Sequence, residues 1–135
     1  MAMGLTTTST TVTVSGSVQT GFPKAGTGQT IKVLANGKAG TNVTAGTGIT
    51  AGAVTAGKIF YVSSIAISTN TDGEGIEIRD NAIGGILKAA FKLYAGAATS
   101  TISATFPTPL SFATDVFIDV SITGYVFYTI SGWEE

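Results

Sequence analysis

The sequence contains neither cysteine nor histidine. Without cysteine the chain has no disulfide and no thiolate nucleophile, and without both residues it lacks the usual ligands of zinc. A Ser-His-Asp triad and acid–base catalysis by histidine are excluded for the same reason. We therefore expect no enzymatic activity, and the sequence suggests no cofactor.

Charge is also scarce, since charged residues make up 11% of the chain and the formal net charge is -1. This balance argues against binding to nucleic acid. The charges are unevenly placed, because the residues up to Gly57 carry only three lysines and no acid, whereas the rest is acidic overall. The three lysines are Lys24, Lys32 and Lys38. Such an asymmetry indicates two parts with different neighbours.

Long apolar runs are missing as well. No stretch of about 18 apolar residues occurs, so we expect no membrane-spanning segment. The first ten residues, MAMGLTTTST, lack a basic region followed by an apolar block, so no secretory signal is expected. The length of 135 residues fits one ordinary domain.

The first part of the chain is rich in threonine, glycine and alanine. Valine alternates with threonine in TVTVS (residues 11–15), and TIKVLA (residues 30–35) is a second strand candidate. We interpret residues 1–56 as an N-terminal arm with short strands. Three interpretations stay open, namely a disordered tail, an arm that becomes ordered against another subunit, and strands of the same sandwich.

The second part, residues 57–135, alternates apolar and polar residues in short segments separated by turns. In ILKAAFKLY (residues 86–94) a helix is the alternative, but the alternation favours a strand. The prolines of PTPL (residues 107–110) should interrupt the ladder of hydrogen bonds. About seven strands at regular spacing predict an all-β fold, an antiparallel β-sandwich of the jelly-roll kind.

Apolar residues on both faces of the expected strands are the most informative feature. The segment KIFYVSSIAI (residues 58–67) predicts a core face that includes Tyr61, Ile65 and Ile67. The residues expected to point away from the core are Phe60, Val62, Phe117, Tyr125 and Phe127. Apolar side chains on an outer face need a cover, which could be the N-terminal segment, a second subunit or a stacked carbohydrate. We favour a subunit or capsid interface formed by these residues together with the three lysines.

Two other motifs give weaker evidence for a binding site. Asp72 and Glu74 lie in the turn NTDGEGIE and form a weak candidate for calcium binding, although the same residues serve a hairpin turn. The glycines of GTGITAG (residues 46–52) have neither of the spacings found in phosphate-binding loops.

Four segments together resemble small β-sandwich virion proteins of tailed bacteriophages. They are GKIFYVSSIAISTN, IEIRDNAIGGIL, FPTPLSFATDVFIDVSI and GYVFYTISGWEE, which span Gly57 to Glu135. The shared pattern is a long strand ending in Ser/Thr/Asn, a strand ending in Arg-Asp before a Gly-Gly turn, a Pro-Leu step and a closing Gly-Tyr strand.

The resemblance implies a structural role on the outer surface of the capsid, most of all that of a decoration protein that cements the shell. It implies the major capsid protein and further copies of the chain, as a homotrimer, as partners. Three alternatives are a tail, collar or fibre subunit, a small jelly-roll capsid subunit, and a carbohydrate-binding module in which Trp133 would belong to the stacking platform.

Overall fold

The computed structural model of the protein describes residues 28–94, 96 and 98–135. The predicted strand at residues 11–15 and Lys24 lie outside these residues. Nine strands and no helix are found in the described part of the chain. The strands are β1 (Thr30–Ala35), β2 (Thr41–Val43), β3 (Ile49–Ala53), β4 (Phe60–Thr69), β5 (Glu74–Asp80), β6 (Ile86–Leu93), β7 (Ser100–Phe112), β8 (Asp115–Val120) and β9 (Gly124–Glu134).

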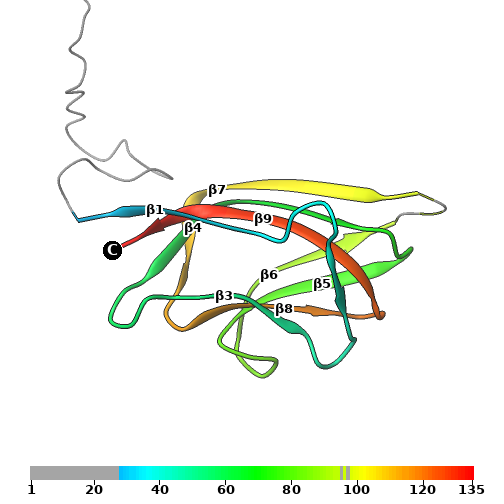
Figure 1. Ribbon diagram of the computed structural model, residues 1–135, viewed down its shortest axis with the longest axis horizontal. Helices are drawn as coiled ribbons and strands as arrows, with labels where there is room; N and C mark the ends of the chain where they lie inside the picture. The colour runs from blue at the N-terminus through cyan, green and yellow to red at the C-terminus, as the bar shows by residue number, and fades with distance from the viewer. Residues whose placement is uncertain (1–27, 95, 97) are drawn as a thin grey trace, which may run out of the picture.

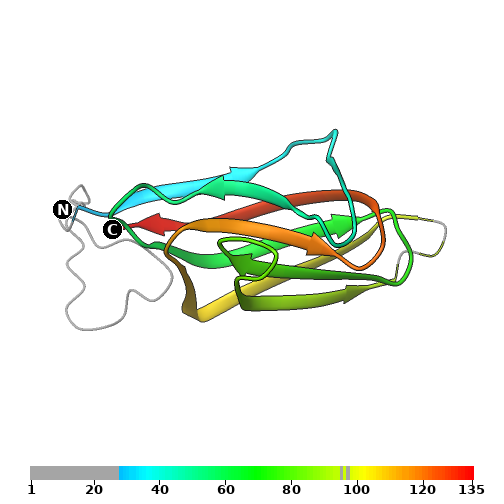
Figure 2. The same cartoon turned by 90° about the horizontal axis from the view of Figure 1, so that it is seen from below.

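The strands form two antiparallel sheets that pack face to face (Figures 1 and 2). One sheet has the order β1-β9-β4-β7, with β2 also pairing with β9, and the other has the order β3-β8-β5-β6. The first and last strands described are therefore neighbours, and from β6 to β9 the chain passes from one sheet to the other at each step. The predicted fold class is confirmed.

The core lies between the two sheets and consists mainly of β-branched and aromatic side chains. Alternate residues of each strand point into it, as the period of two requires. On β8 the inward residues are Val116, Ile118 and Val120, as the alternation predicts. They meet Ile65 and Ile67 of the opposite sheet in one apolar cluster.

A β-bulge in β4 reverses the faces predicted for the beginning of that strand. The pairing of β4 with β9 passes from Val62–Gly132 to Ser64–Ser131, so Ser63 is an extra residue against β9. Phe60 and Val62 therefore point into the core together with Ile65 and Ile67, and both are fully buried. The prediction that Phe60 and Val62 face outward is wrong, because strict alternation cannot detect an inserted residue.

Two other strand predictions are confirmed. Residues 86–93 form strand β6, so the helical alternative is excluded. The ladder between β4 and β7 is interrupted at the prolines, since Val62 pairs with Leu110 and Ser64 with Thr105. Residues 106–109 thus have no partner on β4. Pro107 and Pro109, which have no N–H to donate, therefore lie where the ladder requires no donor.

The sandwich begins before residue 57. Strands β1 and β2 pair with β9, and β3 pairs with β8, so residues 30–53 contribute to both sheets. Three interpretations of the N-terminal part were open. For residues 30–53 the structure agrees with the third, in which this part supplies strands of the same sandwich. The predicted arm of residues 1–56 therefore includes three strands of the sandwich, and its first 27 residues lie outside the described part of the chain.

Candidate interaction surfaces

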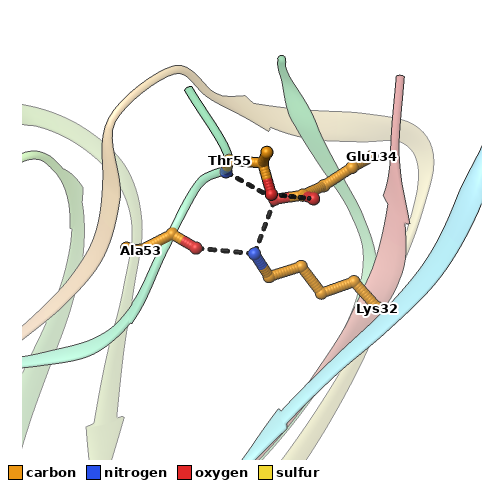
Figure 3. Close-up of polar contacts among 4 residues, drawn as sticks. All are labelled: Lys32, Ala53, Thr55 and Glu134. Atoms are coloured by element: carbon orange, nitrogen blue, oxygen red, sulfur yellow. Dashed lines mark hydrogen bonds and ion pairs between the residues drawn. The ribbon is translucent and has the colours of Figure 1, made fainter. Parts of the chain in front are cut away.

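Lys32 belongs to a polar cluster at one corner of the sandwich, where β1, β9 and the β3–β4 connection meet (Figure 3). Its ammonium group lies 2.5 Å from Oε1 of Glu134 and donates a hydrogen bond of 2.6 Å to the carbonyl of Ala53. Thr55 donates to the same carboxylate from its backbone N–H (2.9 Å) and from its hydroxyl (2.7 Å). The ammonium group of Lys32 is thus paired within the molecule, and its predicted place on a capsid interface stays a prediction.

The surroundings of Glu134 shift its protonation. Burial alone would raise the pKa of the carboxyl group. The hydrogen bonds from Lys32 and Thr55, together with the charge of Lys32, outweigh burial and lower the pKa from 4.5 to about 2. The carboxylate is therefore ionised at any pH near neutrality, and it joins three separate segments of the chain.

Phe117 lies on the outer face of its sheet, as predicted, but the chain itself covers it. The ring is 8% exposed, and a Cβ atom added at Gly48 would lie 2.4 Å from it. The connection between β2 and β3 passes over Phe117, and glycine allows the backbone to approach so closely. Phe117 is consequently not available to another subunit.

Lys38 and Phe127 come together on the outer face of the β1-β9-β4-β7 sheet. They line a shallow hollow of about 340 Å³, with Ala35, Ala66 and Ser68 among its other walls. Phe127 is half-buried, because Gly40 passes over one side of its ring. Tyr125 is the outward-facing residue two positions earlier on β9 and is 46% exposed. Lys38, Tyr125 and Phe127 are the predicted interface residues that remain on one accessible face.

At the other end of β9, the ring of Trp133 stacks on that of Tyr61, with centroids 5.5 Å apart and planes inclined by 23°. Trp133 is 7% exposed, so it cannot serve as an open platform for a sugar ring. Its indole N–H is buried and has no hydrogen-bond partner among the described residues. Tyr61 faces outward rather than inward, which is the second consequence of the bulge at Ser63.

Two residues that the sequence interpretation did not single out are the most exposed apolar side chains of this corner. Ile31 is 71% exposed and Val33 is 54% exposed, both on the outer face of β1. Ile31 pairs across the strands with Trp133, and Val33 pairs with Ser131. We call Ile31 and Val33 the β1 strip. Their spacing by two residues in TIKVLA places both side chains on one face of a strand. That they form an exposed strip follows only from the position of β1 at the edge of the described sheet.

The calcium candidates Asp72 and Glu74 have separate neighbours. Asp72 is exposed, and its carboxylate accepts a hydrogen bond from the N–H of Gly96 (3.0 Å). Glu74 is fully buried, and its Oε1 accepts from the N–H of Ile122 (2.9 Å) and the hydroxyl of Ser121 (3.3 Å). Within the part of the chain that the structure covers, no three metal-ligating side chains gather. Glu74 instead joins the beginning of β5 to the β8–β9 connection.

The hairpin between β5 and β6 carries a further apolar group. Ile83, Ile86 and Leu87 are all more than two-fifths exposed at its tip. The turn includes Asn81 with a φ of 90°, and a Cβ atom on Gly85 would lie 1.8 Å from the carbonyl oxygen of Asp80. This tip belongs to the opposite sheet from the β1 strip, so it is a separate surface.

Comparison with known proteins adds no relative. A scan of protein-family models finds no match to the chain, and a search of curated proteins finds none either. None of the described residues forms a helix long and apolar enough to cross a membrane.

Proposed function

We propose that the protein is a structural component of a phage virion, and specifically a capsid decoration protein that binds the assembled shell. The observation that carries this proposal is the outer face of the β1-β9-β4-β7 sheet. Lys38 and Phe127 line one hollow of this face, Tyr125 is exposed two residues before Phe127 on β9, and the β1 strip lies at the edge of the sheet. A solvated sheet face is normally polar, so apolar and aromatic residues there fit a surface that another protein covers.

Binding of this kind stabilises a shell by mass action. A protein that binds the assembled shell, and not its separated subunits, shifts the equilibrium toward the shell. Several weak contacts made by an oligomer add through a high effective concentration. The proposed partners are the major capsid protein and further copies of the chain, and the proposed location is the outer surface of the particle.

Charge suggests which side of the molecule meets the shell. Lys38 is exposed beside the hollow, and none of the described residues that line the hollow is acidic. A basic side chain beside aromatic rings suits an acidic, partly apolar region of a capsid protein. Lys32 takes no part in this contact, because its charge is held by Glu134.

The test is co-sedimentation of the purified protein with empty shells of the same virus assembled without it. The full chain should sediment with the shells, and Lys38→Glu combined with Tyr125→Ser should weaken binding roughly tenfold or more, since both side chains are exposed on the proposed contact face. Lys58→Glu is the matched control, because it makes the same charge change at the opposite end of β4. Circular dichroism confirms that each variant is folded.

The result that would overturn the proposal is a folded full chain that does not sediment with shells at any concentration. Imaging of labelled particles separates a head position from a tail, collar or fibre position. Binding on a glycan array, which the buried Trp133 disfavours, would instead support the carbohydrate-binding alternative.

A further inference from the structure

We propose that residues 37–40 are a binding loop inserted into the edge of the β1-β9-β4-β7 sheet, and that Asn36 is the residue that positions this loop. We call residues 37–40 the Lys38 loop. The role of Asn36 rests on the proposed function, because the Lys38 loop forms part of the proposed contact face. It is supported by the register of β1 and β2 on β9, by the hydrogen bonds of Asn36 and by the close approach of Gly40 to Phe127.

The ladder on β9 does not need the Lys38 loop. Ala35, the last residue of β1, pairs with Thr129, and Thr41, the first residue of β2, pairs with Val126. The five residues 36–40 therefore stand opposite only two residues of β9. An uninterrupted strand would place two residues there, so three of the five are in excess. Insertions of this kind on a rigid scaffold are where binding residues are concentrated.

The side chain of Asn36 takes the place of the interrupted strand. Its Oδ1 accepts a hydrogen bond from the N–H of Tyr128 (2.9 Å). Its Nδ2 donates to the carbonyl of Val126 (2.8 Å) and to Oγ1 of Thr41 (3.0 Å). The backbone N–H of Asn36 also donates to the carbonyl of Tyr128 (3.4 Å). Asn36 thus ties the end of β1 to the beginning of β2 and closes the base of the Lys38 loop, and alanine in its place would lose all three side-chain hydrogen bonds.

The Lys38 loop rests on the ring of Phe127. Gly37 and Gly40 have φ values of 69° and 65°, a conformation that glycine adopts without strain. The N–H of Gly40 donates to the carbonyl of Gly37 (3.4 Å), which closes a turn around Lys38. A Cβ atom on Gly40 would lie 2.6 Å from the ring of Phe127. The turn therefore holds Lys38 at the wall of the hollow that Phe127 also lines.

A loop that is already fixed loses little chain entropy when a partner binds. Lys38 is exposed and belongs to neither ion pair of the described residues. Its ammonium group is therefore open to a carboxylate of the partner, and the ring of Phe127 in the same hollow suits an apolar side chain next to that carboxylate. If the loop were released at Asn36, it would keep these side chains but would have to be ordered on binding.

The test measures the binding of the full chain to empty shells by co-sedimentation and the amide hydrogen exchange of the free protein. The variants are Asn36→Ala, Lys38→Ala and the two combined. Asn81→Ala is the matched control, because Asn81 is an exposed asparagine in the β5–β6 connection of the other sheet. Its φ of 90° makes alanine unfavourable there, so the control also loses stability, but far from the Lys38 loop.

We expect Asn36→Ala to weaken shell binding roughly tenfold and Asn81→Ala to leave it unchanged. Amide exchange at Gly40 and Tyr128 should become faster in Asn36→Ala only, because the loop opens and Tyr128 loses its acceptor. The two losses of affinity should not add. Lys38→Ala should weaken binding much less in the Asn36→Ala background than in the wild type, since the released loop no longer holds the ammonium group in place. A residue that only stabilises the fold would give additive losses.

Deletion of residues 38–40 is a second test, which does not depend on the stability of Asn36→Ala. The deletion brings Thr41 into the register that β1 sets on β9. The variant should therefore fold, with a melting temperature close to that of the wild type. Its shell binding should be at least as weak as that of Lys38→Ala, because the whole loop is missing.

Three results would overturn the proposal. The first is a folded Asn36→Ala variant that binds shells as tightly as the wild type, or whose loss of affinity adds fully to that of Lys38→Ala. The second is a deletion variant that does not fold, which would make the Lys38 loop a necessary part of the sandwich. Both leave the proposed function intact. The third is a wild-type chain that does not bind shells, which overturns the proposed function and the binding role of the loop with it.

Discussion

The ammonium group of Lys32 and the carboxylate of Glu134 lie 2.5 Å apart, although 102 residues separate them in the sequence. This contact joins the first and last strands of the described sandwich at its polar corner. Thr55 completes it with two hydrogen bonds to the same carboxylate. Four predictions follow from this and other contacts.

Replacement of Glu134 by glutamine should lower stability and remove part of its acid dependence. The folded-state pKa of about 2 lies below the ordinary value of 4.5, so the contribution is complete above about pH 5 and is lost as the pH falls from 4.5 toward 2. A shift of that size corresponds to roughly 3 kcal/mol. Urea denaturation at pH 7 and at pH 2.5 should show a large difference for Glu134→Gln only at pH 7. An equal difference at both pH values would contradict the assigned protonation.

Two replacements of Glu74 should differ in their effect on the free energy of unfolding. Glu74→Ala leaves the N–H of Ile122 without an acceptor inside the protein and should cost about 2–3 kcal/mol. Glu74→Gln keeps one acceptor oxygen for the N–H of Ile122, so it should cost much less. Thermal and urea unfolding measure the difference. If Gln and Ala at this position proved equally destabilising, the hydrogen bond to Ile122 would not be the reason.

Two glycines of the β2–β3 connection provide a matched pair. Gly46 and Gly48 have φ values of 75° and 66°, so alanine is strained at both. Nothing lies within 4 Å of a Cβ at Gly46, whereas the ring of Phe117 would be 2.4 Å away at Gly48. We expect Gly46→Ala to cost about 1 kcal/mol and Gly48→Ala about 3 kcal/mol or more. Similar values for the two variants would show that Phe117 moves aside freely.

Deletion of Ser63 should be far more harmful than its replacement. Ser63→Ala removes the hydrogen bond from its hydroxyl to the carbonyl of Ser131 (3.2 Å) and should cost about 1 kcal/mol. Deletion removes the bulge and turns one half of β4 to the wrong face, so that either Phe60 and Val62 or Ile65 and Ile67 would leave the core. Expression of soluble, folded protein and its melting temperature test this. A deletion variant as stable as Ser63→Ala would mean that the bulge can move along the strand.

The sequence was sufficient for the fold class because its main signal is local. Alternation and turn residues identified β1 and β6. The face of Phe60 and Val62 could not be predicted, since the extra residue at Ser63 changes the period without changing the composition.

The candidate surface was only partly predictable. Tyr125 and Phe127 face outward as expected. The ion pair of Lys32 depends on Glu134, and the burial of Phe117 depends on the close approach of Gly48. Both are contacts between residues far apart in the chain. The β1 strip was missed for a similar reason, because edge positions follow from strand order, which alternation does not encode.

The position of β9 between β1 and β4 has a consequence for synthesis on the ribosome. β9 also pairs with β2, so it supplies the ladder partner of three strands, yet it emerges after all of them. Until its 11 residues leave the exit tunnel, β1 and β2 have no partner strand within the described chain, and β4 has only β7. A nascent chain halted before Gly124 should therefore be sensitive to protease, and resistance should appear only after Glu134 has emerged.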